Sequence, residues 1–299
     1  MKLKDKINNY IFKNSNKIKI NSKDIKKNDI FLALKGKKYH GNKFISDAFK
    51  FGAKYCITDK KYTEYKKKEN ILFVENIYSY LKNISIQKRS LFNGEVIGIT
   101  GSAGKTSLKE YLSFFLKKKY KVSASIKSYN NNLGVMISIL NMNLKSNYAI
   151  FEIGTNNYFE IRKLTKLVKP SQIFITNILS THLANFKNKR NIAIEKSDIF
   201  KKKYNSLAEI LIFQNKSKEE QLIYDIAKKE KLKKLIQVGT KIDQCYIKKV
   251  KKLKSKYEIT LKIFNKNYKI FVREYEEKTI LNLMFVFIFF VLNRINTNV

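Results

Sequence analysis

Short blocks of hydrophobic residues, separated by polar segments rich in lysine and asparagine, predict alternating strands and helices along most of the chain. In the first third, Phe44–Phe51 has the spacing of a helix, and Gly52 directly after it is a typical helix stop. Three short apolar runs predict strands: Asp29–Leu34, Ala53–Thr58 and Ile71–Val74. We therefore expect a small α/β domain over residues 1–93.

From Glu95 onward, short and continuously apolar runs alternate with segments of helical spacing. The runs predict strands at Val96–Thr100, Ala149–Ile153, Ile173–Thr176 and Ile210–Phe213. The segments between them predict helices at Lys105–Lys119, Tyr158–Val168 and Ile192–Lys203. Strands of this kind are typical of parallel sheets that are covered by helices on both faces. The expected fold class is therefore α/β, with a central domain over residues 94–299 built on a doubly wound, mostly parallel sheet.

The last part of the chain adds a predicted hairpin and a final helix. Tyr257–Phe264 and Tyr268–Val272 flank Asn265–Asn267, a pattern that predicts two antiparallel strands. The final helix is expected at Thr279–Leu292. Its longest apolar run, Leu283–Leu292, has ten residues, whereas a membrane-spanning helix needs about 20. We expect this helix to be buried in the domain, and we expect no membrane span.

The formal net charge of +38 comes almost entirely from lysine. A strongly basic chain can bind nucleic acid, but these lysines are spread from Lys2 to Lys278. No arginine-rich segment, zinc-finger spacing or RNP-type aromatic motif accompanies them. We therefore expect solvated, lysine-covered faces and no nucleic-acid partner.

The two cysteines and the start of the chain bear on the cellular compartment. Cys56 and Cys245 lie far apart in apolar, strand-like settings, so we expect buried free thiols in a reducing environment. The segment Met1–Asp5 lacks the apolar core of a signal peptide. The expected location is the cytoplasm.

The strongest local motif is Gly101-Ser102-Ala103-Gly104-Lys105-Thr106, which directly follows a predicted strand and opens a predicted helix. Glycines allow backbone N–H groups to curl around phosphate oxygens, and the helix N-terminus adds partial positive charge. A lysine in this place reaches the outer phosphates, and the hydroxyl after it can bind Mg²⁺. The full phosphate-loop pattern has a further glycine where this chain has Ile99. The motif predicts nucleotide binding, with a glycine-rich turn as the alternative.

Three other residues are candidates with weaker signals. Glu152 ends a predicted core strand, where ligands of α/β sheets gather and a carboxylate can hold Mg²⁺; the alternative is a solvent-facing glutamate. His182, one of two histidines, follows another strand end, and a structural role is its alternative. Lys196 by itself is one more lysine in a lysine-rich chain.

Taken together, five motifs in the same order resemble the central domain of the Mur ligases. They are Thr100–Thr106, Tyr129–Val135, Glu152–Asn156, Ile175–Asn177 with Thr181–Leu183, and Glu195–Phe200. Before them, Asn28–Gly36, His40–Gly41 and Phe44–Ile45 resemble the uridine-nucleotide-binding domain of the same family. The resemblance covers residues 20–293.

The resemblance implies a role for each matching residue. ATP would be bound by Gly101, Ser102, Ala103, Gly104, Lys105, Thr106 and Ser107, with Asn282 near the adenine. Mg²⁺ would be held by Thr106, Glu152, His182 and Lys196, the last as a carbamate. The catalytic residues would be Lys105, His182 and Lys196.

The resemblance also implies a reaction, the ATP-dependent formation of an amide bond through an acyl phosphate in peptidoglycan precursor synthesis. The Asn130–Val135 stretch and the Gly154-Thr155-Asn156 run are most similar to the branch of the family that joins D-alanyl-D-alanine to UDP-N-acetylmuramoyl-tripeptide. In that family a third, C-terminal domain follows, whereas this sequence ends at Val299. We expect a ligase without this domain, or one completed by a separately encoded domain. A nucleotide-binding or UDP-sugar-binding remnant and a different phosphate-loop ATPase remain alternatives.

Overall fold

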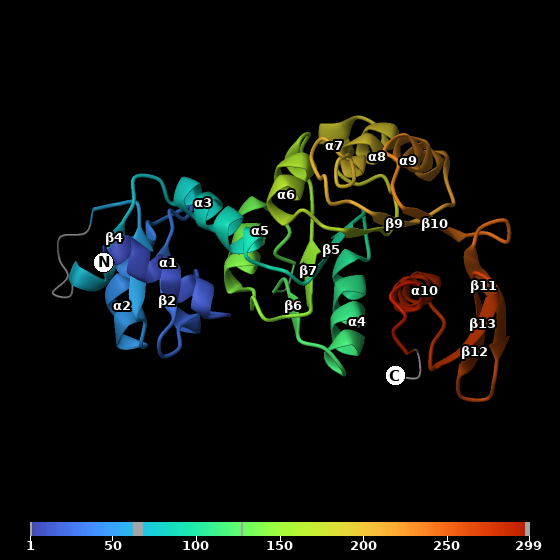
Figure 1. Cartoon of the computed structure of the whole chain (residues 1–299), viewed down its shortest axis with the longest axis horizontal. Coiled ribbons are helices and arrows are strands. Elements are labelled where there is room, and N and C mark those ends of the chain that lie inside the picture. The colour runs from blue at the N-terminus through green and yellow to red at the C-terminus, as the bar shows by residue number, and fades with distance from the viewer. Residues whose placement is uncertain (1, 62–67, 127, 297–299) are drawn as a thin grey trace. The chain divides into compact units, whose positions relative to one another are not determined.

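The computed structural model describes residues 2–61, 68–126 and 128–296. The chain divides into two compact units, one formed by residues 1–93 and 136–145 and the other by residues 94–135 and 146–299 (Figure 1). Residues 136–145 were expected in the central domain. The structure instead groups them with the first unit, because the carboxyl end of one helix bonds to groups of that unit.

Among its described residues, the first unit contains a four-stranded parallel sheet in the order β1-β2-β3-β4. The predicted strands are confirmed, but the helix expected at Phe44–Phe51 is split into a 3₁₀ turn and a short α-helix. The elements are α1 (Leu3–Lys13), β1 (Ile18–Lys19), η1 (Ser22–Asp24), β2 (Ile30–Ala33), η2 (Gly41–Phe44), α2 (Ile45–Lys50), β3 (Tyr55–Thr58), η3 (Lys68–Asn70), β4 (Ile71–Phe73) and α3 (Ile77–Ser90).

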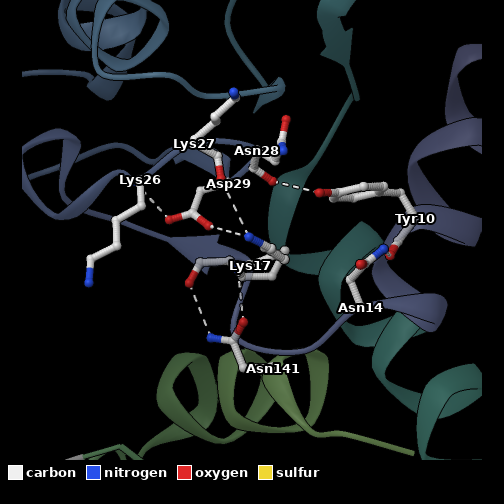
Figure 2. A network of polar contacts seen from close by, with 9 residues as sticks. Tyr10, Asn14, Lys17, Lys26, Lys27, Asn28, Asp29 and Asn141 are labelled. Atoms are coloured by element: carbon white, nitrogen blue, oxygen red, sulfur yellow. Dashed lines mark hydrogen bonds and ion pairs between the residues drawn. The ribbon is translucent and has the colours of Figure 1, made fainter.

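Polar side chains fasten residues 136–145 within the first unit, among them those of Asn141 and Lys88. Asn141 accepts a hydrogen bond from the backbone N–H of Ile18 at 2.8 Å and donates one to its carbonyl at 3.1 Å, so its amide continues the edge of β1 (Figure 2). The amine of Lys88, which is fully buried, donates to the carbonyl oxygens of Ile11, Asn14 and Leu140. These carbonyls stand at helix ends, where backbone acceptors lack partners inside the helix.

In the part of the second unit that the structure describes, nine strands form one sheet in the order β13-β12-β11-β10-β9-β8-β5-β7-β6. From β6 to β11 neighbouring strands are parallel, and β12 and β13 are antiparallel to their neighbours. The expected α/β class with a mostly parallel sheet is confirmed. The elements are β5 (Glu95–Thr100), α4 (Lys105–Lys117), β6 (Val122–Ala124), α5 (Asn132–Asn141), β7 (Tyr148–Glu152), α6 (Glu160–Val168), β8 (Gln172–Ile175), α7 (Leu183–Phe186), α8 (Lys189–Ser197), β9 (Ile210–Gln214), α9 (Lys218–Lys229), β10 (Lys234–Gly239), β11 (Cys245–Lys252), β12 (Tyr257–Ile263), β13 (Lys266–Val272) and α10 (Glu277–Leu292).

Helices cover the two faces of the central part of this sheet, which explains why β5, β7, β8 and β9 are buried on both sides. Ile97 and Ile99 of β5 pack in one buried cluster with the apolar residues of α4 and α10, which lie side by side (Figure 1). Gly98, between them, faces the opposite side, where a Cβ would lie 2.7 Å from Pro170 and 3.3 Å from Ile199. The final helix is therefore buried, as expected. None of the helices in the described ranges meets the length and hydrophobicity that a bilayer crossing requires.

The structure corrects one predicted helix, extends the predicted hairpin and confirms the free thiols. The helix expected at Ile192–Lys203 is wrong at its end, because α8 stops at Ser197. Beyond it, the side-chain amide of Asn205 donates a hydrogen bond to the carbonyl of Ile199. The hairpin β12–β13 is confirmed, but it is extended by β11, which was not predicted. Cys56 and Cys245 are buried free thiols, as expected.

Candidate functional site

The glycine-rich loop follows β5, the strand at which the order of successive strands in the sheet reverses. The chain runs from β5 to β6 and β7 on one side, then crosses to β8 on the other side. In open α/β sheets, the carboxyl ends of strands at such a switch point border a crevice that binds ligands. Gly101–Gly104, Glu152 at the end of β7 and Asn177 after β8 all belong to this edge of the second unit.

The two glycines of the loop adopt backbone conformations that other residues rarely take. Gly101 has a φ of 142°, and a Cβ on it would lie 1.9 Å from the hydroxyl oxygen of Thr176. Gly104 has a φ of 80° and is the N-cap of α4. Only glycine tolerates these conformations at little cost. The loop therefore packs tightly on the strand end and delivers the next residues to the first turn of α4.

Asn177 anchors the middle of the loop. Its side-chain oxygen accepts from the N–H of Ala103 at 2.9 Å, and its carbonyl accepts from the N–H of Ser102 at 3.0 Å. The hydroxyl of Thr176 donates to the Ala103 carbonyl at 2.6 Å. A phosphate contact through the amides of Ser102 and Ala103 would replace these bonds with bonds to the ligand.

Lys105 and Lys196 meet at the carbonyl oxygen of Gly101. The amine of Lys105 donates to it at 2.9 Å and to the Ser102 carbonyl at 3.3 Å. The amine of Lys196, a residue only 3% exposed, donates to the same oxygen at 3.1 Å. Burial lowers the pKa of both amines, that of Lys196 to about 7 with a further contribution from the neighbouring charge of Lys105. The carboxylate of Glu152 opposes the shift in the pKa of Lys105.

Glu152 is the acidic group of the site. Its side chain is 1% exposed, and its two carboxylate oxygens accept from the hydroxyl of Thr106 at 2.8 Å and from the amide of Asn130 at 2.7 Å. A carboxylate and a hydroxyl beside a glycine-rich loop are hard oxygen ligands, the kind that Mg²⁺ binds together with phosphate oxygens. The residues present therefore fit a magnesium–nucleotide complex.

Glu195 orders the helix that carries Lys196. Its carboxylate oxygens accept from the backbone N–H groups of Phe159 at 2.8 Å and Ile161 at 2.9 Å. These groups lie at the N-terminus of α6, where N–H groups lack partners inside the helix. Burial raises the pKa of Glu195, and the two backbone hydrogen bonds oppose this shift. The pair of bonds joins α8 to α6 and holds Lys196 beside the loop.

Three predicted residues remain, Asn282, Ser107 and His182, and among the described contacts only the side chain of Asn282 has a hydrogen bond to the loop. The amide of Asn282, on α10, donates to the Gly104 carbonyl at 3.2 Å, so α10 reaches the start of α4. Ser107 is exposed on the first turn of α4. His182 is exposed at the N-cap of α7 with a φ of 56°. Within the described part of the chain, no hydrogen bond or ion pair joins its ring to Glu152, Thr106 or Lys196, and no cluster of three or more His, Cys, Asp or Glu side chains stands ready for a metal.

A cavity of about 280 Å³ opens next to Glu152. Asn130, which bonds to Glu152, forms part of its wall together with the N-terminus of α5, the loop after β7 and the start of α6. The residues that line it are Asn130, Asn131, Asn132, Gly154, Thr155, Asn156, Glu160, Lys163 and Leu164. More than half of the lining residues carry an amide or a hydroxyl, and Lys163 and Glu160 add one cation and one carboxylate, which suits a ligand with polar groups.

Sequence reasoning assigned no role to Asn130, Asn177 or Glu195, although each belongs to a motif that it quoted. The signal for Asn177 was its position two residues beyond the end of β8. Asn130 and Glu195 gave no such signal, because the groups that they contact, at Glu152 and in α6, are distant in sequence.

Comparison with known proteins agrees with the fold and the motifs. Residues 99–290 match the model of the Mur ligase middle domain, and residues 15–97 match the model of the Mur ligase family catalytic domain. A UDP-N-acetylmuramoyl-tripeptide–D-alanyl-D-alanine ligase of Rickettsia prowazekii is 40% identical over 188 residues, which cover 63% of this chain and 41% of that protein. The ligase of the same name from Buchnera aphidicola of Baizongia pistaciae is 37% identical over 171 residues, 57% of this chain and 37% of the relative. The matches thus span about two fifths of the length of these relatives.

Solved structures show the same architecture. MurF of Acinetobacter baumannii superposes with a TM-score of 0.78 at 23% identity, covering 94% of this chain and 60% of that one. MurF ligase of Thermotoga maritima, solved in complex with ADP, has a TM-score of 0.77 at 24% identity and covers 96% of this chain and 64% of its own. The middle-domain match alone extends over more than half of the sequence, and it contains the loop, Glu152, His182 and Lys196. The chain belongs to the Mur ligase family.

Proposed function

We propose that this chain forms the ATP-binding and carboxylate-activating part of a ligase that joins D-alanyl-D-alanine to UDP-N-acetylmuramoyl-tripeptide in peptidoglycan precursor synthesis. The observation that carries the proposal is the convergence of Lys105, Thr106 and Glu152 at the switch point of the sheet. The names of the relatives support the substrates. ATP and UDP-linked sugars are substrates available in the cytoplasm, where we propose that the reaction takes place.

In the proposed reaction, a carboxylate oxygen of the tripeptide attacks the γ-phosphorus of ATP, the bond to the ADP oxygen breaks, and an acyl phosphate forms. The amine of D-alanyl-D-alanine then attacks the acyl carbon, the bond to phosphate breaks, and the amine loses a proton as the amide forms. Lys105 would bind the outer phosphates and balance the charge that spreads over their oxygens. Thr106 and Glu152 would hold Mg²⁺, with His182 and a carbamate of Lys196 as its other proposed ligands. Mg²⁺ neutralises phosphate charge.

The cavity beside Glu152 is the proposed place for part of the UDP-N-acetylmuramoyl-tripeptide. It adjoins the carboxylate through Asn130, and its amide-rich wall offers donors and acceptors for a sugar and a peptide backbone. Lys163 is its cationic group and is exposed. Lys163→Gln is expected to raise KM for this substrate and to leave KM for ATP unchanged.

The test of the function is a reconstituted ligation assay. Positioning of two substrates contributes about 7–11 kcal/mol to such a reaction, and the matches span only about two fifths of the relatives' length. We therefore expect negligible ligation by a polypeptide of residues 1–299. Phosphate release and product formation should appear when the C-terminal domain of a related ligase is added as a second polypeptide.

The controls separate the alternatives. ATP binding without ligation in the reconstituted system would favour a nucleotide-binding remnant over a ligase. ATP hydrolysis that does not depend on the UDP-linked substrate would favour a different ATPase. Robust ligation by residues 1–299 alone would contradict the need for added residues but not the reaction.

A further inference from the structure

Lys109 is a fully buried lysine one helical turn after Lys105 on α4. Lysine side chains are almost never fully buried unless their amines have partners. The amine of Lys109 donates to the carbonyl of Ser125 at 2.9 Å and lies 3.1 Å from a carboxylate oxygen of Glu110, whose side chain is exposed. A backbone acceptor in the interior and a carboxylate at the surface are thus among the partners that make the burial of this lysine tolerable.

Ser125, the interior partner, is itself fastened to β7. It directly follows β6, and its N–H donates to the Ile150 carbonyl at 3.0 Å. Its hydroxyl oxygen accepts from the backbone N–H of Glu152 at 3.3 Å. Ser125 therefore links the two residues: its carbonyl accepts from the amine of Lys109, and its hydroxyl accepts from the backbone N–H of Glu152.

The same helix also contacts the other end of Glu152. The hydroxyl of Thr106 donates to the Glu152 carboxylate, and Thr106 and Lys109 are three residues apart, on one face of α4. Helix α4 thus touches the carboxylate directly through Thr106 and orders the backbone behind it through Lys109 and Ser125. A carboxylate binds a metal ion at a defined position only if both its oxygens and the backbone that carries it are held in place.

We propose that Lys109 is a positioning residue that acts through Ser125 to fix the backbone of Glu152, and with it the carboxylate that takes Mg²⁺. The proposal rests on the proposed function, because it assigns Glu152 to the metal of the nucleotide complex. Lys109 is fully buried, so its side chain is not accessible to a bound nucleotide. Its effect is therefore on the dependence of ATP binding on Mg²⁺ and not on ATP binding in the absence of metal.

The experiment measures ATP affinity of residues 1–299 by calorimetry over a series of Mg²⁺ concentrations. Lys109→Met keeps the apolar stem but removes the charge and the donor, and Ser125→Ala removes the hydroxyl that faces Glu152. Each is expected to raise the Mg²⁺ concentration needed for half-maximal ATP affinity by about 10-fold, the effect typical of groups that orient metal ligands. The double variant should be no weaker than the weaker single variant, since both act on one chain of contacts. Lys117→Met, an exposed lysine of the same helix, is the matched control.

The outcomes are distinct. An unchanged Mg²⁺ dependence in Lys109→Met, or fully additive effects in the double variant, would overturn the proposal while ATP binding by the wild type upholds the nucleotide site. If the wild type binds no ATP, the proposed function fails, and the role of Lys109 fails with it. Circular dichroism checks folding; if Lys109→Met does not fold, Ser125→Ala decides, because it keeps the carbonyl that Lys109 contacts.

Discussion

Lys105 and Lys196 donate hydrogen bonds to one and the same acceptor, the carbonyl oxygen of Gly101, at 2.9 and 3.1 Å. Burial lowers the pKa of Lys196 to about 7, and repulsion by the neighbouring ammonium group of Lys105 adds to the shift. A neutral amine can add CO₂ and release a proton, which yields a carbamate anion. With that change, the repulsion between the two side chains would become an attraction.

Lys196→Ala is expected to lower ligation in the reconstituted assay by about 100-fold or more, because the site loses a charge-bearing group next to the phosphates. Short carboxylates such as formate, acetate or propionate should partly restore the rate by replacing the carbamate. Lys189→Ala, an exposed lysine on the same helix, serves as the control and should be as active as the wild type. Full activity of Lys196→Ala would refute the role.

Lys105→Ala should weaken Mg²⁺-dependent ATP binding by about 10- to 150-fold, since hydrogen bonds to charged groups are each worth about 1.5–3 kcal/mol. Calorimetry on residues 1–299 measures the change, with Lys117→Ala as the exposed control on α4. Equal affinities of wild type and Lys105→Ala would show that the loop does not bind phosphate through this lysine.

Gly101→Ala should disrupt the loop, because its φ of 142° is strained for alanine and its Cβ would lie 1.9 Å from the Thr176 hydroxyl oxygen. Strain of this kind costs about 1–3 kcal/mol before the collision is counted. We expect ATP binding to fall below detection and Thr176→Ala in the same chain to restore part of it. Gly52→Ala, also at positive φ but in the first unit, should lower stability without changing ATP affinity. Normal ATP binding by Gly101→Ala would contradict the described loop conformation.

The burial of Lys88 leads us to expect that the stability of the folded chain depends on pH. Burial lowers the pKa of its amine to about 7, although three carbonyl oxygens favour the charged form. The unfolded chain keeps this proton up to a pKa of about 10.4. Between these values the unfolded state binds more protons, so the free energy of unfolding rises with pH, by at most about 1.4 kcal/mol per pH unit. Below pH 7 this lysine is charged in both states and contributes no slope.

Urea unfolding at several pH values between 7 and 10 measures this effect for the wild type and for Lys88→Met. Other lysines and tyrosines titrate in both proteins, so the informative quantity is the difference between their free energies of unfolding. That difference should shift in favour of the wild type as the pH rises. A difference that stays constant would mean that Lys88 remains charged in the folded state.

Local patterns in the sequence were sufficient to predict the central strand, the glycine-rich loop and the following helix of the second unit. The strand β5, the glycine loop and the start of α4 follow from an apolar run, two glycines and helical spacing, which act over a few residues. The position of Glu152 at a strand end followed in the same way. The motif order was enough to identify the family, which the comparisons then showed.

The tertiary structure alone decided which lysines are buried. Lys88, Lys109 and Lys196 look like any other lysine in a chain of formal net charge +38, since their burial depends on backbone carbonyls that other segments supply. The grouping of residues 136–145 with the first unit was equally invisible, because Asn141 bonds to Ile18, which is distant in sequence. The periodicity of hydrophobic residues indicates whether a segment is a helix or a strand and which of its faces is apolar. The acceptors that make a buried charge tolerable are brought together only when distant segments pack.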